Sequence, residues 1–87
     1  MQYKNITFKW ELSSNEKYII DYLLDNNYEI LSSRQYISKM VLVVKKNNLT
    51  TMFDIPYNIK DIERYCMLLE KQFEMEENYY NKLGGLM

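Results

Sequence analysis

The sequence predicts an α+β fold in one small domain, residues 1–87, in the order strand, helix, two or three antiparallel strands, long C-terminal helix. Apolar and polar residues alternate over residues 6–12, a pattern typical of a half-buried strand. Ser13 and Glu16 form a capping box, which begins a helix. From residue 59, apolar residues recur three and four apart, which predicts a second, longer helix. A chain of 87 residues is long enough for one domain only.

The predicted first helix follows Ser13 and ends near Asn26 and Asn27, where Asn tolerates the left-handed conformation that closes a helix. Its apolar stripe comprises Ile19, Ile20, Leu23 and Leu24. Its opposite face carries Tyr18, Asp21, Tyr22 and Asp25. This helix therefore has one face for a core and one aromatic, acidic face for solvent or a partner.

Residues 28–55 are rich in strand-forming residues. We expect a short strand at 28–31, a break at Ser32-Ser33, a central strand over 36–46 and a returning strand over 49–55 that Pro56 ends. The segment 45–48 contains Asn47-Asn48 and is typical of a hairpin turn. The central strand is apolar on both faces between Met40 and Val44, so if both helices cover one side of the sheet, the other side is an open apolar surface.

The second helix is expected to begin near Asn58, with Asp61 as a capping-box partner, and to close at Gly84-Gly85. Its core stripe comprises Ile59, Ile62, Cys66, Leu69, Phe73 and Tyr80. A second stripe beside it comprises Tyr65, Leu68, Met75 and Tyr79. At about 26 residues the helix would be ~39 Å long, whereas strands of six to eight residues reach ~20–27 Å, so we expect it to overhang the sheet or to bend.

The two stripes together cover roughly 200° of the helix, which is more than one small sheet can bury. We therefore expect the second stripe to meet a partner, such as a second copy of the chain in a homodimer. The alternative is that it packs on the first helix or the N-terminal strand.

Composition argues against an enzyme. The chain has no His and one Cys, so it has neither a zinc ligand set nor a His-activated nucleophile, and its two Gly supply no phosphate-binding loop. The pairs Asp21/Asp25 and Glu70/Glu74 have the spacing of one helical face, but nothing else at a recognisable spacing would complete a metal site. We expect no catalytic activity, metal or cofactor, and we expect Cys66 to be a buried small hydrophobe.

A single Cys fits a reducing compartment such as the cytoplasm. No signal peptide is visible, and the longest aliphatic run, residues 40–44, is far short of the ~20 residues that span a bilayer, so we expect no membrane association. Ala is absent, while Asn, Ile, Lys and Tyr make up 35 of 87 residues. This bias follows A/T-rich codons and points to a phage or another mobile element.

Two patches are candidates for binding a partner protein. The first is the outer face of the first helix, with Tyr18, Asp21, Tyr22 and Asp25. The second is acidic, with Glu70, Glu74 and Glu77 on the second helix. Aromatic side chains dominate interface hot spots, and carboxylates suit a basic partner. The alternative for both patches is an ordinary solvated helix face.

A basic edge offers a different reading. Its candidates for contacting nucleic acid are Arg34, Lys39, Lys45 and Lys46. The order helix, three strands, helix over 14–83 resembles the double-stranded-RNA-binding domain in outline. That family begins its second helix with a Lys-rich motif, and the corresponding segment 57–62 reads Tyr-Asn-Ile-Lys-Asp-Ile. The Lys-rich motif is thus missing here. The four basic residues still leave an alternative function open, a dimeric nucleic-acid-binding regulator that uses this basic hairpin edge.

In size, lack of Ala and excess of Tyr, Asn, Lys and Ile, the chain resembles small phage-encoded host-takeover proteins, including anti-CRISPR proteins. The resemblance implies stoichiometric inhibition of a host protein or protein–nucleic-acid complex by direct protein–protein contact. A structural subunit of a phage particle or a member of a toxin–antitoxin pair is a further alternative.

Overall fold

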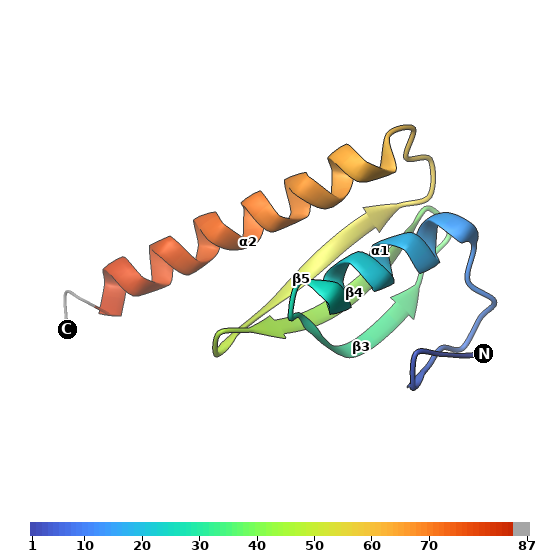
Figure 1. The fold of residues 1–87 in the computed structure, drawn as a ribbon, viewed down its shortest axis with the longest axis horizontal. Coiled ribbons are helices and arrows are strands. Elements are labelled where there is room, and N and C mark those ends of the chain that lie inside the picture. Colours follow the sequence, from blue (N-terminus) through green and yellow to red (C-terminus); the bar gives the residue numbers. More distant parts are fainter. Residues whose placement is uncertain (85–87) are drawn as a thin grey trace.

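The computed structural model describes residues 1–84 and confirms the α+β class (Figure 1). A short hairpin, β1 (Gln2–Tyr3) and β2 (Ile6–Thr7), precedes helix α1 (Ser14–Asp25). Three strands follow, β3 (Glu29–Gln35), β4 (Lys39–Lys46) and β5 (Leu49–Pro56), and the chain continues into the long helix α2 (Ile62–Gly84). The strands β3, β4 and β5 form one antiparallel sheet in that order.

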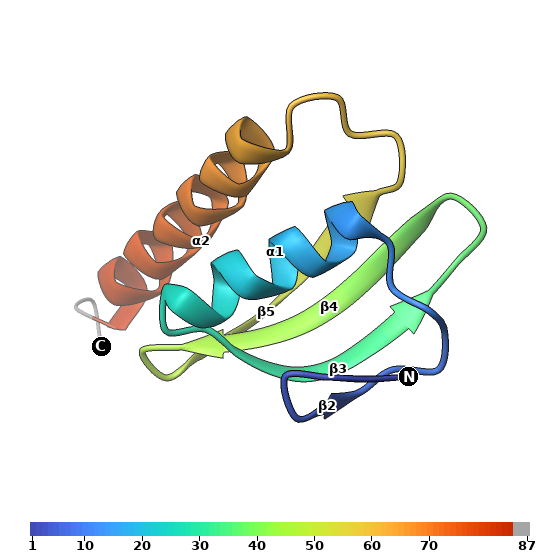
Figure 2. The same cartoon turned by 45° about the vertical axis from the view of Figure 1, so that its right-hand side comes forward.

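Both helices lie on the same face of this sheet (Figures 1 and 2). The covered face carries alternate residues of the two strands beneath them: Met40, Leu42 and Val44 of β4, and Phe53 and Ile55 of β5, all fully buried. The opposite face carries Val41 and Val43, which are half-buried, and Met52, which is 57% exposed. The sequence predicts an open apolar side if both helices cover one face of the sheet, and the sheet has that side.

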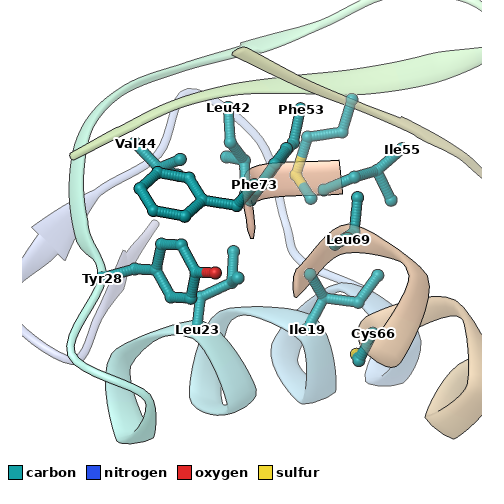
Figure 3. Close-up of a cluster of buried hydrophobic side chains, with 11 residues drawn as sticks. Ile19, Leu23, Tyr28, Leu42, Val44, Phe53, Ile55, Cys66, Leu69 and Phe73 are labelled. Atoms are coloured by element: carbon teal, nitrogen blue, oxygen red, sulfur yellow. The ribbon is translucent and has the colours of Figure 1, made fainter. Parts of the chain in front are cut away.

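The core lies between the sheet and the two helices, as Figure 3 shows. The ring of Tyr28 makes edge-to-face contacts with Phe53 and with Phe73, at centroid distances of 6.0 and 5.1 Å. Ile19 and Leu23 of α1 face the same cluster, and Cys66 lies between the two helices. These contacts join α1, α2 and the sheet into one unit.

The predicted capping box of α1 is confirmed. The Ser13 hydroxyl accepts from the Glu16 backbone N–H at 3.2 Å, and the Ser13 N–H donates to Glu16 Oε1 at 2.8 Å. The other carboxylate oxygen accepts from the Trp10 indole N–H at 2.9 Å. Both oxygens of Glu16, which is only 5% exposed, therefore have a hydrogen-bond donor. At the far end Asn27 has a φ of 69°, the left-handed residue that the sequence predicted.

The predicted strand over 6–12 is wrong beyond Thr7. A tight turn at Lys4 and Asn5, both with positive φ, folds the chain back, and the Phe8 N–H donates to the Met1 carbonyl at 2.6 Å. Among the described residues, no strand pairs with the segment after Thr7. Its alternation has another cause: Phe8 and Leu12 are buried with Ile20 of α1 in a second small cluster.

The strands differ from the prediction in detail. Ser32-Ser33 does not break the chain, because β3 passes through it and absorbs the irregularity as a register shift between Ile30 and Ser32. The central strand begins at Lys39, three residues later than expected. The turn at Asn47 and Asn48 has positive φ at both residues, and β5 ends at Pro56, both as predicted.

Helix α2 begins at Ile62 and not near Asn58. The Asp61 carboxylate accepts from the Arg64 N–H at 3.1 Å, so Asp61 is the residue that caps the helix. Cys66, Leu69 and Phe73 are buried as expected, whereas Tyr80 is 55% exposed. Gly84 is the last described residue of the helix, and the Gly85 part of the predicted terminator lies outside the described residues.

Tyr80 is exposed because the sheet ends before it does. The carboxylates of Glu76 and Glu77 accept from the side chains of Thr51 and Asn47 at the β4–β5 hairpin. Beyond these contacts α2 extends past the sheet, as Figure 1 shows. The predicted overhang is therefore present.

Phe73→Ala removes the ring on which α2, Tyr28 and the sheet meet. We expect a loss of about 3–5 kcal/mol in the free energy of unfolding, most of the stability of a domain this small. Denaturant titration followed by circular dichroism measures it. Met67→Ala, on the same helix but 64% exposed, is the control and should cost far less. Equal losses of stability in the two variants would show that Phe73 is not part of the core.

Glu16→Ala leaves the Ser13 N–H and the Trp10 indole N–H without their acceptor. We expect a loss of about 1–3 kcal/mol in the free energy of unfolding. Glu11→Ala, a nearby exposed Glu outside the capping box, is the control. Thermal melts compare the three proteins, and a Glu16→Ala melt matching that of the control would contradict the role of the carboxylate.

Candidate functional site

An outward-facing groove runs between the two helices. It is lined by Tyr18 and Tyr22 of α1 and by Glu63, Met67, Glu70, Lys71 and Glu74 of α2. Tyr18 and Tyr22 lie one turn apart on α1, and the lining residues of α2 recur three and four apart, so each helix presents one continuous row. The packing of Ile19, Leu23 and Cys66 beneath holds the two rows side by side. We call this surface the interhelical groove.

The interhelical groove is acidic. Three carboxylates and one ammonium group line it, which gives a formal charge of 1 − 3 = −2. Within residues 1–84 the ion pairs are Lys4–Asp21 and Lys39–Asp54, so the carboxylates of Glu63, Glu70 and Glu74 carry no cationic partner there. The groove therefore combines unpaired negative charge with two aromatic rings.

The tyrosines at and beneath the groove respond to this charge. Burial, and then the Glu70 carboxylate, raises the pKa of Tyr22. Burial, and then Glu63, raises the pKa of Tyr18. Deeper in the core, burial followed by Glu70 and Glu74 raises the pKa of Tyr28 to about 12. These phenols therefore stay neutral at physiological pH in a region of negative potential.

The groove brings together part of each patch predicted for partner binding. Tyr18 and Tyr22 came from one predicted patch, Glu70 and Glu74 from the other, and the contact between the helices makes them one surface. Asp21 lies elsewhere, since its carboxylate accepts from the Tyr3 hydroxyl at 2.9 Å and pairs with Lys4 at 3.7 Å.

Asp25 and Glu77 also lie outside the groove. Asp25 is exposed at the end of α1, and Glu77 accepts from Asn47 at 3.0 Å. Sequence reasoning missed Glu63, Met67 and Lys71 as groove residues. Their spacing of three and four from Glu70 and Glu74 was a usable signal, but only the position of α1 shows which face of α2 it borders.

The second stripe of α2 is largely uncovered. Leu68, Met75 and Tyr79 are 53%, 68% and 60% exposed, so the alternative that they pack on α1 or the N-terminal segment is wrong. Tyr65 differs, because it is half-buried against the core and its hydroxyl donates to the Asp54 carbonyl at 2.7 Å. The excess apolar surface predicted from the sequence is therefore present on this helix.

The four basic candidates do not form one edge. Lys45 and Lys46 are adjacent in β4 and point to opposite faces of the sheet, with the Lys46 ammonium 4.6 Å from the centre of the Tyr28 ring. Lys39 is paired with Asp54 at 3.0 Å. Arg34 is exposed on β3, where it lines a shallow hollow with Val41 and Met52 on the open sheet face.

Residues 1–84 contain no cluster of three His, Cys, Asp or Glu side chains able to hold a metal ion, and none of their helices is long and apolar enough to cross a membrane. Cys66 is fully buried, and burial followed by Glu70 raises the pKa of its thiol to about 11. Comparison of the chain with known protein families, curated proteins and solved structures finds no match.

The pKa of Tyr28 predicts alkaline unfolding. Because the folded-state value of about 12 lies above the unfolded value of about 10, the neutral phenol stabilises the fold fully below pH 10, and this stability is lost as the pH rises towards 12. A tyrosinate absorbance titration with parallel circular dichroism should show one tyrosine that ionises after all the others, with unfolding in that window. Tyr28→Phe keeps the ring and should abolish the late step. A wild-type titration in which every tyrosine ionises near pH 10 would contradict the assignment.

Proposed function

We propose that this chain is a small interaction protein that binds a basic, arginine-bearing segment of a protein partner in the interhelical groove. The supporting observation is that two tyrosines of α1 face three unpaired carboxylates of α2 across one groove. A carboxylate can take a guanidinium in two parallel hydrogen bonds, and a tyrosine ring can stack on its plane. The groove offers both contacts at once.

Arginine suits the groove better than lysine. A guanidinium is planar and weakly hydrated, so it can lie on Tyr18 or Tyr22 while it bonds to Glu70 or Glu74. An ammonium group is a strongly hydrated point charge and gains mainly from the charge of the groove. We therefore expect preference for arginine over lysine at equal peptide charge.

The composition suggests where such binding would act. The A/T-codon bias and the resemblance to phage-encoded inhibitors support a protein that works in the cytoplasm of a host cell. We propose that it inhibits a host protein or protein–nucleic-acid complex, in the manner of anti-CRISPR proteins, by covering a basic surface that otherwise contacts phosphates. Carboxylates in the groove would take the place of those phosphates.

The alternative, a dimeric nucleic-acid-binding regulator, has less support. Of its four basic residues, Lys39 is paired with an acid and Lys46 lies over a tyrosine ring. Direct binding of the free protein to DNA or RNA, with affinity that falls steeply as salt rises, would favour this alternative over the groove.

A fluorescent nona-arginine peptide tests the groove. We expect it to bind the wild-type protein more tightly than nona-lysine, with affinity that weakens as salt rises. Glu70→Lys combined with Glu74→Lys should weaken binding at least tenfold, because it reverses two of the three charges. Glu11→Lys combined with Glu29→Lys, a pair of exposed carboxylates away from the groove, is the control of equal charge change.

Two results would contradict the proposal. One is an equal loss in the groove variant and the control, which would mean that net charge alone drives binding. The other is binding of nona-lysine as tight as nona-arginine together with no effect of Tyr18→Ala. If neither result is found, capture from host cells with the wild type and the same variants would identify the physiological partner.

A further inference from the structure

The uncovered side of α2 has the spacing of a coiled coil. The residues Tyr65, Leu68, Gln72, Met75 and Tyr79 follow a strict alternation of three and four, which places them at successive a and d positions of a heptad. We call these five residues the seam. They lie beside the core stripe of the same helix, so α2 carries two parallel rows. Its own domain covers the core stripe and, in the seam, only part of Tyr65.

Towards the C-terminal end of α2, the seam stays apolar while the core stripe becomes polar. After Phe73 the core positions 76 and 77 are Glu, and both carboxylates bond to the β4–β5 hairpin where the sheet ends. The seam continues with Met75 and Tyr79, which are 68% and 60% exposed. The apolar side chains of these last turns therefore lie where the domain's own sheet does not reach them and where a second helix could cover them.

We infer that the seam forms a parallel two-stranded coiled coil with α2 of a second copy of this chain. Two features of the seam, Gln72 and the flanking charges, favour its own copy as the occupant, and the surroundings of the seam favour a helix. In a parallel pair, Gln72 at an a position meets Gln72 of the second copy, and two amides can bond to each other there as a buried Asn pair does.

The flanking charges agree with this register. In a parallel coiled coil the g residue of one helix lies beside the e residue of the next heptad in the other. Lys71 occupies g and Glu76 occupies e, so the two-fold axis places two Lys71–Glu76 pairs between copies, in which the ammonium meets the Glu76 carboxylate oxygen that Thr51 does not occupy. At the neighbouring g and e positions, Arg64 corresponds to Leu69, which is buried in its own domain, and Asn78 corresponds to Leu83, so no like charges meet.

The surroundings of the seam leave room for a helix. A hollow lined by Thr50, Met75, Tyr79 and Tyr80 lies between the overhanging end of α2 and the edge strand β5. Strand addition at that edge is opposed by Tyr65, whose hydroxyl already occupies the Asp54 carbonyl. A second helix is therefore favoured over a second sheet.

The contact is modest in size. From Tyr65 to Tyr79 the seam spans about 21 Å at 1.5 Å per residue, so the buried area falls below the ~800 Å² per partner of a standard interface. We expect a reversible dimer with a dissociation constant on the order of micromolar.

Sedimentation of the free protein over a range of concentrations tests the dimer. The wild type should pass from monomer to dimer, and Leu68→Glu combined with Met75→Glu should weaken the association at least 100-fold. Met67→Glu is the matched control, because Met67 is adjacent to Leu68 and as exposed but points about 100° away around the helix. A wild type that remains monomeric at several hundred micromolar, or a control that dissociates as readily as the double variant, would overturn the proposal.

Charge exchange and crosslinking test the register. Lys71→Glu alone and Glu76→Lys alone should each weaken the dimer several-fold, and the double exchange should restore it. Tyr79→Cys should form an intermolecular disulfide under mild oxidation, because a parallel pair brings the two copies of residue 79 together, whereas Asn81→Cys on another face should not. Equal crosslinking of the two Cys variants, or no rescue by the double exchange, would overturn the parallel arrangement.

These measurements use the protein alone and involve no peptide. Failure of the dimer leaves the interhelical groove unaffected, and failure of arginine binding leaves the seam unaffected, so the two proposals are tested separately.

Discussion

The structure depends on a mismatch between a small sheet and a long helix. Strands of eight residues extend about 27 Å, whereas the 23 residues of α2 extend about 35 Å. Packing of Tyr28, Phe53 and Phe73 fixes the middle of the helix to the sheet. The sheet can then bury one stripe of α2 over about three turns, and the remaining apolar surface of the helix stays exposed.

The placement of both helices on one face of the sheet shapes the rest of the surface. Because α1 and α2 share one face of the sheet, they border each other and enclose the interhelical groove, while the second face of the sheet stays open with Val41, Val43 and Met52. One helix on each face of the sheet would have removed both features. Binding surfaces in this chain therefore arise from what a minimal core leaves uncovered.

Local signals predicted the fold well. The capping box at Ser13, the left-handed Asn27, the Asn47-Asn48 turn and the stop at Pro56 each depend on the conformational preferences of a few neighbouring residues. Predictions failed where contacts between residues far apart in the sequence decide the structure. Phe8 and Leu12 alternate with polar residues as in a strand, but they pack on α1. The two acidic and aromatic patches likewise appeared separate, because residues 18–22 and 63–74 meet only through the tertiary contact between α1 and α2.

The two surfaces of α2 can act together because they are separate. The interhelical groove and the seam lie on different sides of one helix and share only Lys71 at their border, so a second copy on the seam leaves Glu70 and Glu74 accessible. A parallel pair would then carry two acidic grooves related by a two-fold axis. Against a partner with two basic segments, the second contact becomes intramolecular, which raises the overall affinity without any new interaction. A chain of 87 residues can in this way present a binding surface larger than its own core could support.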